Sequence, residues 1–286
     1  MIKPSYSALN KSTFMLLLVA LAVSGILKGQ QLPLPPRAND AISGSNFKNQ
    51  IETLNIEDRE KQIYQEVLKG NVPNFLRDLA PITFSKTIKD STYVVTYYVL
   101  PDYLAVGSDT DYFLMPMTPI LAQKIAKAIA FTLPTKQMVD QIWSNASLKL
   151  APSPIPPSPQ MTTIPVMWDH NNQLKLQRKK ARTQAPLGVL VAGHKKDVVI
   201  SNKIYENSSK PVVIYGWHYQ NGTPIQSVYA GHSETYADYS HGIRLVQDSA
   251  LINNNVHLIT TVLQDVDKSS LFSDEGVIEK PSYPLE

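Results

Sequence analysis

The sequence predicts an α+β protein: a mixed or antiparallel sheet with helices packed on it, in a single large domain. Strand-like runs of β-branched and aromatic residues occur in groups, and helix-like segments lie between the groups rather than alternating with single strands. Hydrophobic residues make up 43% of the 286 residues, which is enough to bury a sizeable core. The chain has no cysteine, so neither disulfides nor thiolate metal sites contribute, and the core alone must stabilise the fold.

Residues 1–29 are typical of a signal peptide. Lys3 and Lys11 precede an apolar run, Phe14 to Leu27, that is shorter than the roughly 20 residues a membrane-spanning helix needs. A retained membrane anchor is the alternative. Cleavage after residue 29 would leave equal numbers of basic and acidic residues, and the densest basic run, Lys175 to Arg182, is expected to be a solvated helix face. We therefore expect a secreted or periplasmic protein with no nucleic-acid partner and no membrane span after cleavage.

The first half of the remaining chain is expected to alternate between helical and extended segments. Residues 30–46 are rich in proline and small polar residues, which predicts a flexible leader, with the folded domain spanning 47–286. Asn55 is expected to cap a helix that Gly70 ends. The elements expected next are a short helix at 74–79, strands within 82–100, a strand-turn-strand at 101–113, and helices from Pro119 to Ile129 and from Thr135 to Ala146.

Residues 151–159 contain five prolines, which favours polyproline II and denies the segment regular ladder hydrogen bonds. We interpret this segment as a crossover within one domain, and a boundary between two domains is the alternative. The elements expected after it are a strand at 162–168, a polar helix near 172–183, strands at 187–192, 197–201, 211–218 and 242–246, and a segment at 256–263 that is compatible with either type.

The strongest indication of chemistry is a group of histidines between Trp217 and His241, because histidine exchanges protons or binds metals near neutral pH. His218 is predicted at the end of a strand beside a loop, where catalytic groups commonly emerge. Strand alternation would place it on the face opposite Tyr215 and Trp217. The alternative is a structural histidine that only hydrogen-bonds a nearby carbonyl.

Asp238 and His241 are three residues apart, so a turn or helix would bring their side chains together, whereas a strand would separate them. In the bent form Asp238 could orient His241 as a general base, with Ser240 or a water as the nucleophile. Gly242 favours such an irregular backbone. We therefore expect a catalytic centre made of His218, Asp238, His241 and Ser240.

Other roles are open for neighbouring residues. His218, His232 and His241 could instead bind Zn²⁺, although no compact zinc signature is present and the cofactor remains unknown. The expected substrate-binding residues are Trp217, Tyr215, Tyr239, His194, Asp197 and Arg244, the last as an anion clamp. A noncatalytic alternative is an exported carbohydrate- or peptide-binding protein whose aromatic platform is formed by Trp217, Tyr215, Tyr219, Tyr236 and Tyr239.

Three motifs, Gly-His-Lys-Lys-Asp at 193–197, Tyr-Gly-Trp-His at 215–218 and Asp-Tyr-Ser-His-Gly-Ile-Arg-Leu at 238–245, resemble an uncharacterised family of exported bacterial proteins. The resemblance covers most of residues 90–247. It implies export and one continuous unit across the proline segment, and it supplies no catalytic assignment. With no phosphate-binding loop or dinucleotide fingerprint in the sequence, we expect an exported hydrolase that acts on a cell-envelope or extracellular polymer, with a peptidoglycan-type substrate favoured. The expected partner is an extracellular polymer or a small-molecule substrate.

Overall fold

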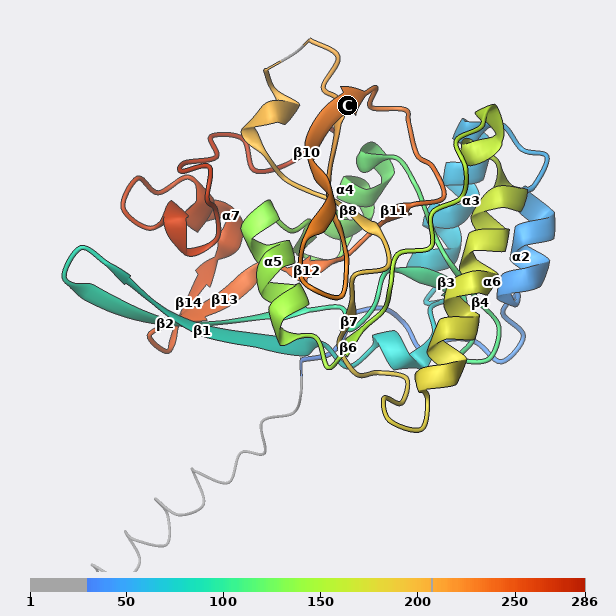
Figure 1. The fold of residues 1–286 in the computed structure, drawn as a ribbon, viewed down its shortest axis with the longest axis horizontal. Coiled ribbons are helices and arrows are strands. Elements are labelled where there is room, and N and C mark those ends of the chain that lie inside the picture. The colour runs from blue at the N-terminus through green and yellow to red at the C-terminus, as the bar shows by residue number, and fades with distance from the viewer. Residues whose placement is uncertain (1–29, 207, 286) are drawn as a thin grey trace, which may run out of the picture. The chain divides into compact units, whose positions relative to one another are not determined.

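The described part of the chain is built around two sheets (Figure 1). The computed structural model describes residues 30–206 and 208–285, so the expected signal peptide lies outside it. The larger sheet has six strands in the order β14-β13-β2-β12-β5, with β1 also paired to β2, and the smaller has four in the order β10-β9-β8-β11. The strands of the larger sheet are β1 Ala80–Ile88, β2 Ser91–Val99, β5 Phe131–Thr132, β12 Val246–Gln247, β13 Ser249–Ile252 and β14 Asn255–Leu258.

The four-stranded sheet carries most of the residues that the sequence marks as candidates. Its strands are β8 Lys196–Val198, β9 Val212–His218, β10 Pro224–His232 and β11 His241–Gly242. β9 is antiparallel to both neighbours, while β11 runs parallel to β8. The remaining strands form two short pairs, β3 Ala105–Gly107 with β4 Tyr112–Leu114 and β6 Leu148–Lys149 with β7 Val191–Ala192.

Some helices lie to one side of the two sheets, and others lie between the strands of the two sheets (Figure 1). Helices α2, α3 and α6 lie beside one another at the right of Figure 1, and α5 packs against β9. Residues 31–286 form a single compact unit, so the predicted single-domain α+β fold is confirmed and the proline segment runs within it. The helices are α2 Gly44–Ile51, α3 Ile56–Leu68, α4 Pro119–Ala128, α5 Lys136–Asn145, α6 Ile164–Ala181 and α7 Ile259–Leu263.

Local capping signals define the helices that the sequence predicts best. The side chain of Asn55 accepts a hydrogen bond from the backbone N–H of Asp58, and Thr135 does the same for Met138 at the start of α5. Gly70 ends α3 with φ +83°, and a Cβ at this position would overlap the carbonyl oxygen of Pro35. These predicted starts and the predicted end of α3 are therefore correct.

The leader expected to be flexible is instead part of the fold. Leu32 and Leu34 are buried in the core, and Gln31 forms a bridge with Asp78. Arg77 donates hydrogen bonds to the carbonyl oxygens of Leu34 and Pro35. Burial of the two leucines stabilises the segment in spite of its high proline content. The first helix, α2, begins at Gly44, within the residues expected to be flexible.

The strand expected at 162–168 is wrong, because these residues lead into the long helix α6. Pro165 occupies the first turn of this helix, where a missing backbone N–H costs nothing. Ile164, Met167 and Leu174 are buried at helical spacing. The short helix at 74–79 is a 3₁₀ turn at Asn74–Leu76, and 256–263 divides into β14 and α7.

The proline segment crosses the surface of the same unit. The backbone N–H of Ile155 donates to the hydroxyl of Tyr239 at 2.8 Å, and that hydroxyl is 3.0 Å from the carbonyl oxygen of Ile155. Gln177 donates to the carbonyl oxygen of Ala151 and to Ser153. Side chains thus replace the ladder hydrogen bonds that the prolines preclude. Among the described residues, no helix is both long and apolar enough to cross a membrane.

Candidate functional site

The end of β9 departs from regular strand geometry. Gly216 has φ +106° and Trp217 has φ +59°, a conformation that is uncommon for a bulky side chain. Simple alternation would place Tyr215 and His218 on opposite faces of the sheet. Both residues instead reach the same carboxylate oxygen, Oδ1 of Asp140, so the predicted alternation is wrong at this end of the strand.

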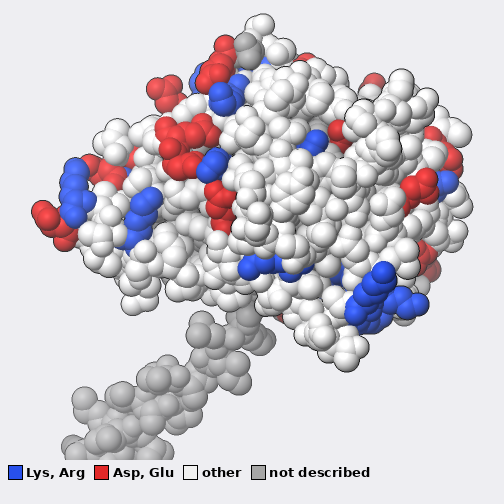
Figure 2. Space-filling view, in the orientation of Figure 1, with Lys and Arg blue, Asp and Glu red and all other residues white. Residues whose placement is uncertain are grey.

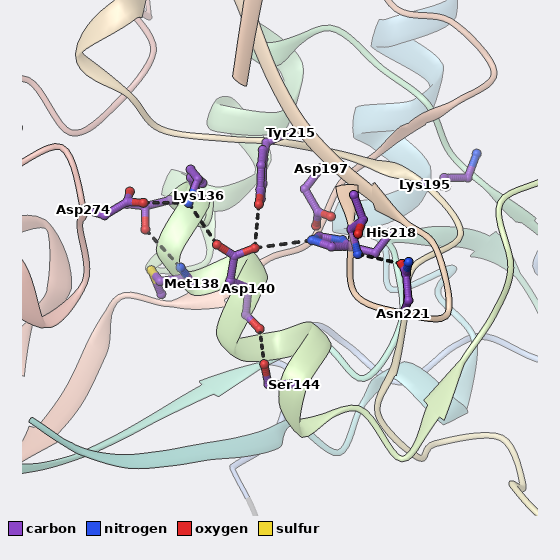
Figure 3. Close-up of polar contacts among 12 residues, drawn as sticks. Lys136, Met138, Asp140, Ser144, Lys195, Asp197, Tyr215, His218, Asn221 and Asp274 are labelled. Carbon is purple, nitrogen blue, oxygen red and sulfur yellow. Dashed lines mark hydrogen bonds and ion pairs between the residues drawn. The ribbon is translucent and has the colours of Figure 1, made fainter. Parts of the chain in front are cut away.

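Asp140 lies on α5 and is held by three donors (Figure 3). The hydroxyl of Tyr215 donates to Oδ1 at 2.7 Å, and Nε2 of His218 lies 3.3 Å from the same oxygen. Lys136 donates to Oδ2 at 3.0 Å and also pairs with Asp274 at 2.6 Å. The side chain of Asp140 is 40% exposed and that of His218 is 3% exposed. The group therefore combines a buried imidazole with a carboxylate that reaches solvent.

The surroundings keep Asp140 ionised. Burial alone would raise the pKa of this carboxyl, but hydrogen bonds from His218, Tyr215 and Lys136 outweigh burial and lower the pKa. An ionised carboxylate can only accept hydrogen bonds, so Nε2 of His218 carries the proton. In the neutral ring Nδ1 is then the unprotonated nitrogen, and no hydrogen bond within the described chain reaches it. A carboxylate that fixes the tautomer of a histidine in this way is the arrangement found in general-base dyads.

Aromatic rings fix the position of the imidazole. The ring of Trp143 lies 5.7 Å from that of His218 at an interplanar angle of 30°, and the ring of Tyr215 meets it edge-on at 5.6 Å. On the strand side, a Cβ at Gly216 would lie 3.3 Å from Cε1 and 3.4 Å from Nδ1 of His218. The absence of a side chain at Gly216 therefore leaves room for the imidazole. Tyr219, which follows His218 in the sequence, is 51% exposed.

Asp197 provides a second carboxyl with the opposite electrostatic character. It lies beside His218 (Figure 3) and is buried. Burial raises its pKa to about 6, against the opposing effects of Arg244 and of a 2.9 Å hydrogen bond from Tyr103. Two carboxyl groups near one imidazole thus have pKa values moved apart, a pattern typical of acid-base sites.

The backbone at Asp238 to His241 bends, as the catalytic interpretation of that motif requires. The N–H of His241 donates to the carbonyl oxygen of Asp238, and Nε2 of His241 lies 4.0 Å from Oδ1 of the same residue. Ser240 donates to this Oδ1 through its backbone N–H and its hydroxyl, and Tyr236 donates to Oδ2. Burial would raise the pKa of Asp238, but the neighbouring His241, the bonds from Ser240 and the charge of Lys196 together lower it.

This second group lacks the geometry of a base and its nucleophile. His241 is fully buried, and neither of its ring nitrogens has a hydrogen-bond partner in residues 30–206 and 208–285. Burial lowers its pKa to about 4 in spite of the attraction of Asp238, so the ring stays neutral and is a weak base at neutral pH. The hydroxyl of Ser240 points to Asp238 rather than to the imidazole. The expected roles of His241 as base and Ser240 as nucleophile do not fit this arrangement.

The predicted catalytic set is divided by β8. Lys196 of this strand pairs with Gly216 of β9 on one side and with His241 of β11 on the other. His218 finds its carboxylate on α5, whereas His241 has Asp238. His232 stacks on Tyr236 with ring centroids 3.9 Å apart. Within residues 30–206 and 208–285 no group of three or more histidine or acidic side chains is arranged to hold a metal ion, so His218, His232 and His241 do not form the proposed zinc site.

Several of the expected substrate-binding residues lie in the interior. Arg244 is fully buried, donates to the carbonyl oxygens of Leu100 and Val191, and lies over the ring of Tyr103, which is a structural position rather than an accessible anion clamp. His194 is buried with its Nε2 3.0 Å from Asp102.

The five aromatic residues of the predicted platform do not present one exposed face. Tyr215, Trp217 and Tyr239 are buried, Tyr236 is partly exposed, and Tyr219 is exposed. Tyr215 contacts the ring of His218, whereas Trp217 and Tyr239 pack against each other with ring centroids 6.3 Å apart. A flat stacking surface therefore does not follow from this arrangement.

Asp140 is the functional candidate that sequence reasoning did not find. The helix that carries it and the capping Thr135 are both predicted, but the carboxylate has no local motif. Its partner His218 lies 78 residues further along the chain, and only the packing of α5 on β9 joins them. Comparison of the chain with protein-family models, with curated proteins and with solved structures gave no match.

Proposed function

We propose that this protein is an exported hydrolase of a cell-envelope or extracellular polymer, with a peptidoglycan-type substrate favoured, and that His218 and Asp140 form its proton-transfer centre. One observation carries the proposal: an ionised, partly exposed carboxylate is hydrogen-bonded to a histidine whose second ring nitrogen has no hydrogen-bond partner within the described part of the chain. This replaces His241 and Asp238 as the base and its orienting group.

The chemistry follows from the tautomer that Asp140 imposes. Nδ1 of His218 accepts a proton from a water molecule, whose oxygen bonds to the electrophilic carbon of the substrate. The same Nδ1 then returns the proton to the departing oxygen or nitrogen as the bond to carbon breaks, so protons and electron pairs balance. Asp140 orients the ring and stabilises the transient imidazolium, and Tyr215 and Lys136 hold Asp140 in place.

The surroundings of the dyad support a large substrate rather than an enclosed small one. Tyr219, which directly follows His218, is exposed. The ring of Trp143 lies against the imidazole, and Nζ of Lys149 is 4.4 Å from the ring centroid of Trp143. Solvent-accessible aromatic rings suit the faces of sugars or peptide units. Export is supported by the apolar run and the lysines of residues 1–29 and by the family resemblance.

The proposal is tested by assaying the purified protein for release of soluble fragments from peptidoglycan and from polysaccharides. Asp140→Asn and His218→Gln should each lose about 10²- to 10⁴-fold in rate, as expected when a positioned base or its orienting group is removed. Ser240→Ala should retain activity, because the hydroxyl of Ser240 only bonds Asp238. Asp267→Asn, which alters an exposed ion pair with Lys89, is the matched control.

Three results would each contradict a part of the proposal. A wild-type protein that degrades none of these polymers removes the hydrolase assignment. Full activity in folded Asp140→Asn removes the dyad. Fractionation of cells that express the full chain tests export, and retention in the cytoplasm contradicts it.

A further inference from the structure

A cavity of about 470 Å³ lies beside the second half of α6, apart from the residues of the dyad. Its size falls within the range of small-molecule sites. Four cationic side chains of α6 and its C-cap line it, together with one carboxylate, Asp109, which already accepts a hydrogen bond from the N–H of Phe75. Figure 2 shows Lys and Arg side chains gathered over this end of the helix. The cationic lining residues are Lys175, Arg178, Lys179 and Arg182.

The spacing of these cations places them on one side of the helix. Positions 175, 178, 179 and 182 follow the three- and four-residue steps of a single helix face. Complementing the helix dipole would account for exposed cations in the last turn, such as Lys179 and Arg182. The helix dipole would not account for a buried cation.

Arg178 is that buried cation. It is 5% exposed, and among the described residues its Nε and Nη1 have no hydrogen-bond partner. Its Nη2 makes a long hydrogen bond of 3.4 Å to the carbonyl oxygen of Pro186, and the carboxylate of Asp102 lies 4.0 Å from Nε. Asp102 also pairs with His194 at 3.0 Å. A guanidinium that has lost water without gaining full hydrogen bonding is costly. Because Arg178 lines the cavity, a rotation of its side chain toward an anion bound there would give the guanidinium the acceptors that it lacks.

The uncharged residues that line the cavity indicate which other chemical groups the anion has. The ring of Tyr112 and the side chains of Leu176 and Leu187 form an apolar wall, and Leu176 is 60% exposed. Asn172 and Thr110 add polar groups that suit a hydroxyl or an ester oxygen. Inorganic phosphate alone would leave this wall unused.

We propose that the α6 cavity binds a small organic oxyanion, a phosphate monoester or a carboxylate on an apolar ring-sized body, with Arg178 and Arg182 holding the oxyanion. The site goes beyond the proposed hydrolase activity and does not depend on it. It also revises the expectation that the basic run of α6 is only a solvated face.

The test is isothermal titration of the full protein with phenyl phosphate, benzoate and inorganic phosphate. At least one organic probe should bind with a dissociation constant of about 1 mM or tighter, and more tightly than inorganic phosphate. Arg178→Gln and Arg182→Gln should each weaken that binding at least about tenfold, the step expected when a charge-assisted hydrogen bond is lost. Because Arg178→Gln leaves Asp102 short of a cation and could unfold, the exposed Arg182 provides the second readout.

Lys180→Gln is the matched control, because Lys180 is exposed on the same helix, changes the net charge equally and does not line the cavity. Its binding of the organic probe should stay within about twofold of wild type. Equal losses in Lys180→Gln and Arg182→Gln would reduce the effect to general charge attraction and overturn the site. Absence of binding by both organic probes, or equal binding of inorganic phosphate, would also overturn it.

Discussion

Tyr215 and His218 reach the same oxygen of Asp140 although they are three positions apart on one strand. In a regular strand their side chains would face opposite ways. The positive φ values of Gly216 and Trp217 turn the backbone between them, so that one face gains both a phenol and an imidazole. Backbone strain of this kind is commonly stored at functional sites, and here it assembles the donors around a carboxylate.

Gly216→Ala should both destabilise the protein and disturb the imidazole. A φ of +106° costs an L-residue about 1–2 kcal/mol, and the new methyl group would lie 3.3 Å from Cε1 of His218. Gly276→Ala is the matched control, since Gly276 has φ +82° and nothing within 4 Å of its Cβ position. Urea denaturation should show the larger loss for Gly216→Ala, and only this variant should shift the ring resonances of His218. Equal losses of stability in the two variants, with unchanged resonances of His218, would show that the imidazole does not need the space left by Gly216.

The parts of the fold that were predictable depend on local chemistry. Asn55, Gly70 and Thr135 mark helix ends through bonds or dihedral angles within a few residues, so their sequence signals suffice. Residues 162–168 were not predictable in this way, because an apolar run is compatible with a strand and only its packing shows that Pro165 lies in the first turn of a helix.

The candidate site was less predictable because its bonds join distant segments. Asp140 and His218 are 78 residues apart, and no neighbour of Asp140 in the sequence distinguishes it from a solvated acid. The positive φ of Trp217 has no sequence signal either, because a bulky residue normally avoids that region. The histidines that the sequence singles out do not converge, because the strands that carry His218 and His241 lie on opposite sides of β8.

The free energy of unfolding of Asp197→Asn should increase relative to that of wild type as the pH rises. Burial raises the folded-state pKa of this carboxyl to about 6 from an ordinary value of 3.8, so the folded state retains a proton that the unfolded chain has released between these pH values. The stability that the protonated group contributes is fully present below pH 3.8 and is lost as the pH rises through about 6. This difference corresponds to at most about 3 kcal/mol.

Urea denaturation of wild type and Asp197→Asn at about pH 4 and about pH 7 measures this effect. The amide retains an acceptor for the hydroxyl of Tyr103, so the comparison isolates ionisation. A stability difference that is the same at both pH values would show that the carboxyl is not held protonated.

Arg244→Lys should lose stability rather than substrate affinity. One ammonium group cannot reproduce the two bonds to the carbonyl oxygens of Leu100 and Val191 or the planar contact with Tyr103. We expect a loss of about 2–4 kcal/mol in the free energy of unfolding. In the folded fraction, KM on the polymer substrate should stay unchanged, because Arg244 is fully buried. A raised KM with unchanged stability would instead support the anion-clamp role that the sequence suggested.

Tyr239→Phe should loosen the proline segment over the Asp238 turn. The hydroxyl of Tyr239 contacts both the N–H and the carbonyl oxygen of Ile155, and the prolines on either side of Ile155 have no N–H of their own to donate. Removing the hydroxyl should cost about 1 kcal/mol, because water can reach the partly exposed Ile155 and replace the bonds. Hydrogen exchange of the Ile155 amide should accelerate. Tyr205→Phe, which removes a hydroxyl bonded to Ser282, should leave that amide unchanged, and equal exchange in both variants would mean that other contacts hold the segment.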